Sequence, residues 1–136
     1  FVWQHGSAPI VLIRGDGGDV RACYNTCRHR GAPVVRTESG QAGTPLVCGY
    51  HGWTYDRQGK LRAVTERRDW DDFDTSCRGL VPVQCERFGN WLFVNEDGDP
   101  EPLADFLTPV ARFMRHLPLE PPRPVNPRVV ELRCYD

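Results

Sequence analysis

Hydrophobic and polar residues alternate in several short segments of the chain, and this period of two predicts β-strands. Glycine-containing turns separate neighbouring segments, at Gly15–Gly18, Asp56–Gly59 and Phe88–Gly89. Because such turns reverse the chain over a few residues, they predict antiparallel hairpins. The segments predicted as strands are residues 9–13, 19–24, 46–47, 53–55, 81–87 and 90–95.

The pattern changes after Pro100. Apolar residues at helical spacing over 103–117 predict an amphipathic helix, broken or restarted at Pro109, whose apolar stripe is interpreted as a packing face. Residues 118–127 contain five prolines, which is typical of a stiff spacer. Residues 128–135 then resume a strand-like pattern.

These elements predict an all-β fold of small antiparallel sheets, followed by a C-terminal helix and a Pro-rich linker. Residues 1–117 are expected to form one domain with the helix trailing it. Residues 118–136 are expected to be a linker and the first strand of a further domain that this sequence does not include. Residues 64–79 are polar and mixed in charge, and their pattern predicts no element.

Composition excludes several classes of function. The chain has 136 residues and a net charge of -1, which gives no electrostatic basis for binding nucleic acid or an acidic membrane surface. It contains no apolar run of the roughly 20 residues that a membrane-spanning helix needs. Six cysteines would allow disulfides, but the absence of a signal peptide favours free thiols in a reducing cytoplasm.

The candidate chemistry lies in two short motifs, Cys27-x-His29 and Cys48-x-x-His51. Each motif offers one thiolate and one imidazole. A structural zinc site is one possible product, although zinc motifs usually place cysteine with cysteine and histidine with histidine. The alternating order favours a Rieske [2Fe–2S] centre, in which two cysteines hold one iron and two histidines hold the other.

The residues flanking the motifs suit this use. Gly31 and Gly52 let the backbone turn tightly and bring N–H groups towards the cluster sulfurs. Tyr50 and Trp53 are expected to shield the site from water. The remaining histidines, His5 and His116, are interpreted as surface or packing residues.

The motifs CRHRG and CGYHGWTYDRQGKL closely resemble the Rieske domain of the ring-hydroxylating oxygenase alpha subunits. The run VRACYNTCRHRGAPVV and the late segment WLFVN are also similar to that family, so the resemblance covers residues 9–110 approximately. The respiratory Rieske proteins carry an extra cysteine in each loop. This sequence has none at the neighbouring positions, which are Thr26, Arg28, Ala32 and Gly49.

The resemblance implies a metal-binding, iron–sulfur oxidoreductase domain for electron transfer. Its cluster ligands would be Cys27, His29, Cys48 and His51, and His51 would be the point at which electrons leave. The residues around the cluster would be Arg30, Gly31, Tyr50, Gly52 and Trp53. No catalytic residue is expected in this sequence. The resemblance places a mononuclear non-heme Fe(II), held by two histidines and a carboxylate, in the further domain.

The resemblance also implies partners. A reductase or ferredoxin would deliver electrons, and neighbouring oxygenase subunits would form a homotrimer in the full-length protein. The activity would be that of a ring-hydroxylating dioxygenase or of a related enzyme that demethylates its substrate. The alternative is a stand-alone Rieske ferredoxin that carries electrons, against which Arg30, Trp53 and the proline-rich spacer count.

Overall fold

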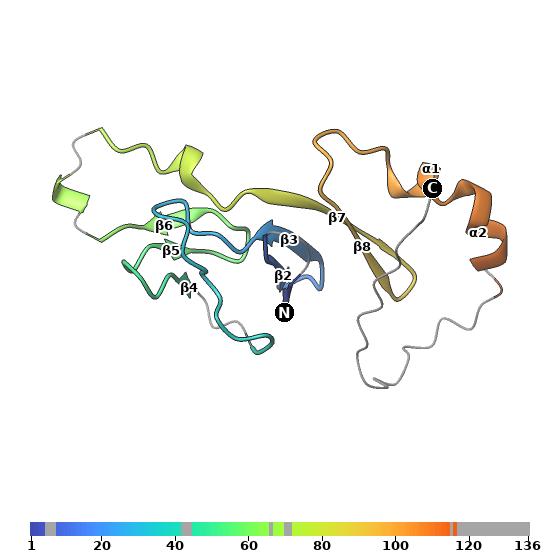
Figure 1. The fold of residues 1–136 in the computed structure, drawn as a ribbon, viewed down its shortest axis with the longest axis horizontal. Helices are drawn as coiled ribbons and strands as arrows, with labels where there is room; N and C mark the ends of the chain where they lie inside the picture. The colour runs from blue at the N-terminus through green and yellow to red at the C-terminus, as the bar shows by residue number, and fades with distance from the viewer. Residues whose placement is uncertain (5–7, 42–44, 66, 70–71, 115, 117–136) are drawn as a thin grey trace, which may run out of the picture.

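The chain folds into two antiparallel β-sheets followed by a short helical segment (Figure 1). The computed structural model describes residues 1–4, 8–41, 45–65, 67–69, 72–114 and 116. The larger sheet has the strand order β1-β2-β3-β7-β8, and the smaller has the order β4-β5-β6. The strands are β1 (Val2–Trp3), β2 (Ile10–Arg14), β3 (Val20–Tyr24), β4 (Leu46–Val47), β5 (Thr54–Tyr55), β6 (Leu61–Ala63), β7 (Pro82–Phe88) and β8 (Trp91–Asn95).

The hairpins predicted across Gly15–Gly18 and Phe88–Gly89 are confirmed. Strands β2 and β3 pair antiparallel in a register that places Arg14 opposite Val20, and β7 and β8 pair with Phe88 opposite Trp91. The two hairpins join through β3 and β7, where Ala22 lies opposite Val83. The all-β prediction is therefore correct.

The hydrophobic core lies between the two sheets and extends to the loops that carry the cysteine motifs. Val11 and Ile13 of β2 face this core, whereas Ile10 of β2 and Ala22 of β3 pack on the opposite face in a second cluster with Val83. The smaller sheet contributes large side chains, of which Tyr55 is fully buried. The main core cluster consists of Val2, Val11, Ile13, Cys23, Cys27, Val34, Leu46, Cys48, Trp53, Tyr55, Leu61 and Leu80.

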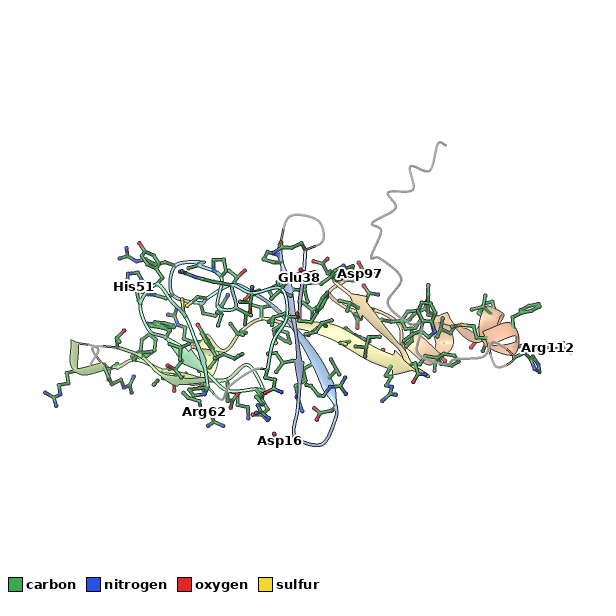
Figure 2. The ribbon with its side chains drawn as sticks, turned by 90° about the horizontal axis from the view of Figure 1, so that it is seen from below. Asp16, Glu38, His51, Arg62, Asp97 and Arg112 are labelled. Carbon is green, nitrogen blue, oxygen red and sulfur yellow. The ribbon has the colours of Figure 1, made fainter. Side chains whose placement is uncertain are left out.

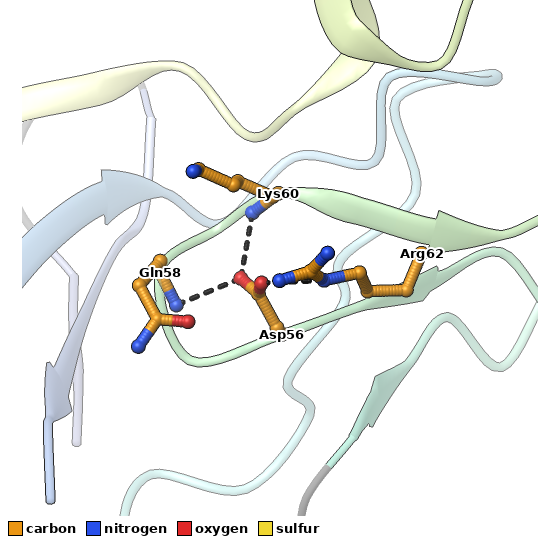
Figure 3. Close-up of polar contacts among 4 residues, drawn as sticks. All are labelled: Asp56, Gln58, Lys60 and Arg62. Atoms are coloured by element: carbon orange, nitrogen blue, oxygen red, sulfur yellow. Dashed lines mark hydrogen bonds and ion pairs between the residues drawn. The ribbon is translucent and has the colours of Figure 1, made fainter.

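A carboxylate fixes the turn between β5 and β6 (Figure 3). Asp56 accepts the backbone N–H groups of Gln58 at 2.8 Å and Lys60 at 2.9 Å through one oxygen. Its other oxygen pairs with Nε of Arg62 at 2.7 Å. The turn continues into Gly59, whose carbonyl accepts the N–H of Leu80 at 2.7 Å and so ties the turn to the core.

Residues 64–79, for which the sequence predicted no element, contain two 3₁₀ turns, η1 (Arg67–Asp69) and η2 (Ser76–Arg78). Phe73 lies between them and packs edge-on against Trp53, with ring centroids 5.4 Å apart. The guanidinium groups of Arg67 and Arg78 lie 5.7 and 5.6 Å from the Phe73 ring centroid. This segment therefore covers one side of the core.

Among the described residues the predicted helix is two helices, α1 (Leu103–Phe106) and α2 (Thr108–Met114), so the helix restarts one residue before the predicted position, Pro109. Proline suits the first turn of a helix, where its missing N–H would have no partner. Glu86 of β7 accepts the N–H of Leu103 at 3.1 Å and links α1 to the sheet.

The apolar stripe of these helices is largely uncovered, contrary to its interpretation as a packing face. Leu107 is buried, whereas Phe106, Val110 and Phe113 are exposed. None of the helices in the described part of the chain has the length and hydropathy needed to span a bilayer. The proline-rich linker and the final strand, predicted at 118–136, lie outside the described residues.

Candidate metal centre

The first cysteine motif lies in a loop closed by two backbone hydrogen bonds. The Cys27 N–H donates to the Ala32 carbonyl at 2.9 Å, and the Cys27 carbonyl accepts the Gly31 N–H at 2.9 Å. Gly31 has a φ of 73°, a conformation that side chains other than glycine rarely adopt. The turn is as tight as predicted, but the Gly31 N–H is used to close it.

The second loop repeats this design. The Cys48 N–H donates to the Trp53 carbonyl at 2.8 Å, and the Cys48 carbonyl accepts the Gly52 N–H at 2.9 Å. Gly52 has a φ of 70°. Each cysteine therefore begins a closed five-residue turn, which fixes the direction of its side chain.

The two loops bring like side chains together. Cys27 and Cys48 are both buried, and the Cys48 thiol is near enough to contribute to the raised pKa of Cys27. The imidazole rings of His29 and His51 have centroids 4.5 Å apart. The structure thus forms one sulfur pair and one nitrogen pair, and each pair takes one member from each loop.

The Cys27 sulfur lies in a defined hydrogen-bonding environment. The Tyr55 hydroxyl lies 3.2 Å from it and accepts the backbone N–H of Arg28 at 3.0 Å. A cysteine sulfur that binds a metal is deprotonated and can only accept, so the hydroxyl would then donate to it. Burial raises the pKa of the Cys27 thiol, while the hydrogen bonds from Tyr55 and the His29 backbone act in the opposite direction.

His29 has the properties of a metal ligand. Its Nδ1 atom is buried and has no hydrogen-bond partner among the described residues, which is unusual for a buried polar atom. Burial is the main cause that lowers the pKa of the imidazole, and the charges of His51 and Arg30 add to the effect. Lowering the pKa favours the neutral form that binds metal. The donor set therefore fits an iron–sulfur cluster.

Aromatic rings flank both histidines. Trp53 is buried and stacks on His29, with centroids 4.9 Å apart and an interplanar angle of 6°. Tyr50 packs against His51 with centroids 3.8 Å apart, but it is 57% exposed. Trp53 thus buries one face of the His29 ring, whereas Tyr50 covers only His51. The Thr65 hydroxyl donates to the His51 carbonyl and holds the second loop from outside.

The structure also reveals positioning residues that sequence reasoning missed. Asn25 is only 2% exposed, and its side chain bonds to the backbone on the far side of the first loop. Its Oδ1 accepts the N–H groups of Val34 and Val35 at 3.1 and 2.9 Å, and its Nδ2 donates to the Val35 carbonyl at 2.7 Å. The sequence held one signal for this role: Asn25 is a polar residue between the strand predicted at 19–24 and the Cys27 motif.

No group of three or more histidine, cysteine, aspartate or glutamate side chains in the described ranges is arranged to hold a metal ion. A structural zinc site would require four such side chains around one ion. A Rieske centre uses the same four kinds of side chain in a different arrangement, with two cysteines on one iron and two histidines on the other.

Comparison with known proteins identifies the fold and its relatives. Residues 2–82 match the family model described as the Rieske [2Fe-2S] domain. The glycine betaine monooxygenase oxygenase subunit of Pseudomonas aeruginosa is 38% identical over 118 residues, covering 86% of this chain and 27% of the relative. The large oxygenase component of the naphthalene 1,2-dioxygenase system of Pseudomonas putida is 33% identical, covering 80% of this chain and 25% of the relative.

Solved structures give the same result. The crystal structure of a quaternary ammonium Rieske monooxygenase in complex with L-carnitine superposes with a TM-score of 0.76 at 30% identity, covering 84% of this chain and 32% of that chain. Naphthalene 1,2-dioxygenase from Rhodococcus sp. superposes with a TM-score of 0.72 at 31% identity, covering 79% of this chain and 25% of that chain. The chain therefore spans only a quarter to a third of the length of these relatives.

Proposed function

This chain belongs to the Rieske [2Fe–2S] domain family, and we propose that it is the electron-transfer domain of an oxygenase. It would relay electrons from a reductase or ferredoxin to a mononuclear iron in another domain, where a small organic substrate is hydroxylated or demethylated. The similarity to oxygenase subunits favours this proposal over the stand-alone ferredoxin.

The pairing of side chains across the two loops carries the proposal. Cys27 and Cys48 would bind one iron, and His29 and His51 the other. The close thiol pair and the close imidazole pair support this division. When bound there, the cluster supplies reversible uptake of one electron.

The surrounding residues would insulate the cluster and direct electron transfer. Trp53 and Phe73 pack together on the His29 side and exclude water. His51 is partly exposed, as His29 is, and lies near one end of the molecule, where it could face another subunit (Figure 2). We propose His51 as the electron exit towards a neighbouring subunit of a homotrimer.

The direct test is to purify the protein with its cluster and titrate it. We expect a red-brown protein that takes up one electron per chain, with a potential in the Rieske range of roughly −150 to +300 mV. Residues 1–136 alone should form no product from any oxygenase substrate. A colourless zinc protein, or a potential near the roughly −400 mV of all-cysteine plant-type clusters, would contradict the ligand assignment.

Replacing Tyr55 by phenylalanine should lower the reduction potential while leaving the cluster bound. The hydroxyl lies 3.2 Å from the Cys27 sulfur, and a hydrogen bond to that sulfur is strongest in the reduced, more negative state. A difference of about 1 kcal/mol between redox states corresponds to roughly 40 mV for one electron. A mediated redox titration measures this shift.

Tyr24→Phe is the matched control, because the Tyr24 hydroxyl bonds to Glu96 at 2.8 Å, outside both ligand loops. Its potential should equal that of the unchanged protein. Equal potentials in Tyr55→Phe and Tyr24→Phe would exclude a tuning role for the Tyr55 hydroxyl.

The remaining proposals rest on the sequence. We propose that residues 1–117 form the Rieske domain and that 118–136 lead into the oxygenase domain. A cytoplasmic location remains the expectation for a protein that works with soluble electron donors.

A further inference from the structure

The side chain of Arg36 lies flat against the second ligand loop. A Cβ atom placed on Gly49 would lie 3.2 Å from Cζ and Nη2 of Arg36 and 3.4 Å from its Nε. Because three atoms of the planar guanidinium are almost equally distant, the group lies face-on over Gly49. Gly49 directly follows Cys48. The cationic side chain of Arg36, which follows the first ligand loop, therefore covers the backbone next to the Cys48 thiol.

The backbone preceding Arg36 is firmly held. Three hydrogen bonds from the buried Asn25 side chain fix both the N–H and the carbonyl of Val35 and the N–H of Val34. The Val34 side chain is also buried in the core. The backbone next to Arg36 is therefore fixed, and its position allows the Arg36 side chain to lie over Gly49.

The charge of Arg36 is not neutralised by any described carboxylate. The ion pairs among the described residues join Arg21 to Asp19, Arg57 to Asp16 and Arg62 to Asp56. The ligand segments 26–36 and 46–53 contain three arginines and no acidic residue. The two ligand segments themselves therefore carry a net positive charge.

We propose that Arg36 is a positioning residue that raises the reduction potential of the cluster. The inference rests on the proposed function, since it requires a cluster held between the two loops. Each electron taken up adds one negative charge, and a nearby cation stabilises the reduced form more than the oxidised form. Arg36 is exposed, so screening limits the effect, and it should weaken as salt is added.

The test compares potentials of the cluster-loaded protein with Arg36 unchanged, Arg36→Gln and Arg36→Lys, using dithionite as the source of electrons. Loss of the charge should lower the equilibrium constant for uptake of one electron about threefold to tenfold, equivalent to roughly 30 to 60 mV. Arg36→Lys should retain most of the original potential, because lysine keeps the charge. The difference between Arg36→Gln and the unchanged protein should shrink between low and high salt.

Arg112→Gln is the matched control for charge. Arg112 lies at the opposite end of the molecule from His51, so its loss should leave the potential unchanged (Figure 2). If Arg36→Gln fails to hold the cluster, Arg36→Met, which is uncharged and about as long as glutamine, replaces it.

The outcomes separate the two proposals. An unchanged protein without a Rieske spectrum would overturn the proposed function itself. A normal spectrum with equal potentials in Arg36→Gln and Arg112→Gln would overturn only the role of Arg36. A potential that falls equally in Arg36→Lys and Arg36→Gln would overturn the assignment to charge.

Discussion

Replacing Cys48 by alanine is expected to abolish cluster binding. The thiol is 2% exposed, and its backbone is fixed by the bonds to Trp53 and Gly52. The loop therefore cannot readily move another ligand into its place. One iron would keep a single protein thiolate, so iron content should fall from about two per chain to near zero, and the visible absorption should disappear.

The same substitution should also lower the thermal stability of the protein. The cluster would join the two loops through metal–ligand bonds, in addition to their ring and hydrogen-bond contacts, and metal binding that requires the folded state stabilises that state. Thermal unfolding followed by circular dichroism measures this loss. The fall in thermal stability should be much larger than the fall that the missing sulfur contacts alone would cause.

Cys77→Ala provides the control, because Cys77 is an exposed free thiol in the η2 turn. It should keep the iron content and the visible spectrum of the unchanged protein. Retention of two irons by Cys48→Ala would show that another residue completes the ligand set. Loss of iron in both variants would point to a general effect of the thiols on assembly.

The local features of the fold could be predicted from the sequence. The strand predicted at residues 9–13 is observed at Ile10–Arg14, and the one at 90–95 is observed at Trp91–Asn95. Alternation and glycine turns determine these elements over a few residues, so no distant contact is needed to infer them. The cysteine and histidine motifs are local in the same way.

Contacts between distant segments could not be predicted. Strand β3 pairs with β7 through Ala22 and Val83, and no periodic pattern records which strands become neighbours. Strand β1 has two residues and is too short to show a period. The Asn25 hydrogen bonds and the contact of Arg36 with Gly49 likewise depend on how the loops meet in space.

The helical stripe shows a further limit of sequence patterns. Apolar spacing correctly predicted helices near residues 103–114, but it did not reveal whether a partner covers the stripe. Phe113 is 74% exposed, although its position in the pattern matches that of a core residue. Periodicity reports which face of a helix is apolar, and only the tertiary structure shows what that face contacts.

Replacing Asp56 by alanine is expected to destabilise the protein by about 2–4 kcal/mol. The side chain is buried, and the substitution removes the acceptor for the N–H groups of Gln58 and Lys60 (Figure 3). Each poorly satisfied donor costs about 1–3 kcal/mol. The midpoint of thermal unfolding should fall by about 10 °C for a domain of this size.

Two further variants separate the turn from the ion pair. Arg62→Gln removes the ion pair only, and because the Arg62 side chain is 61% exposed, its loss should cost less than about 1 kcal/mol. Asp56→Asn keeps an oxygen for the two backbone donors, so its stability should lie between those of Asp56→Ala and Arg62→Gln. Equal losses in Asp56→Ala and Arg62→Gln would exclude the backbone hydrogen bonds as the main contribution.

The effect of Asp56→Ala should also reach the candidate metal centre. Asp56 directly follows Tyr55, whose hydroxyl contacts the Cys27 sulfur, and the turn fixes the end of the strand that carries Tyr55. A loosened turn should weaken this contact and lower the reduction potential in the same direction as Tyr55→Phe. Because both changes act through one hydrogen bond, the double variant should show little further shift beyond that of Tyr55→Phe. Full additivity of the two shifts would mean that Asp56 acts on the cluster by another route.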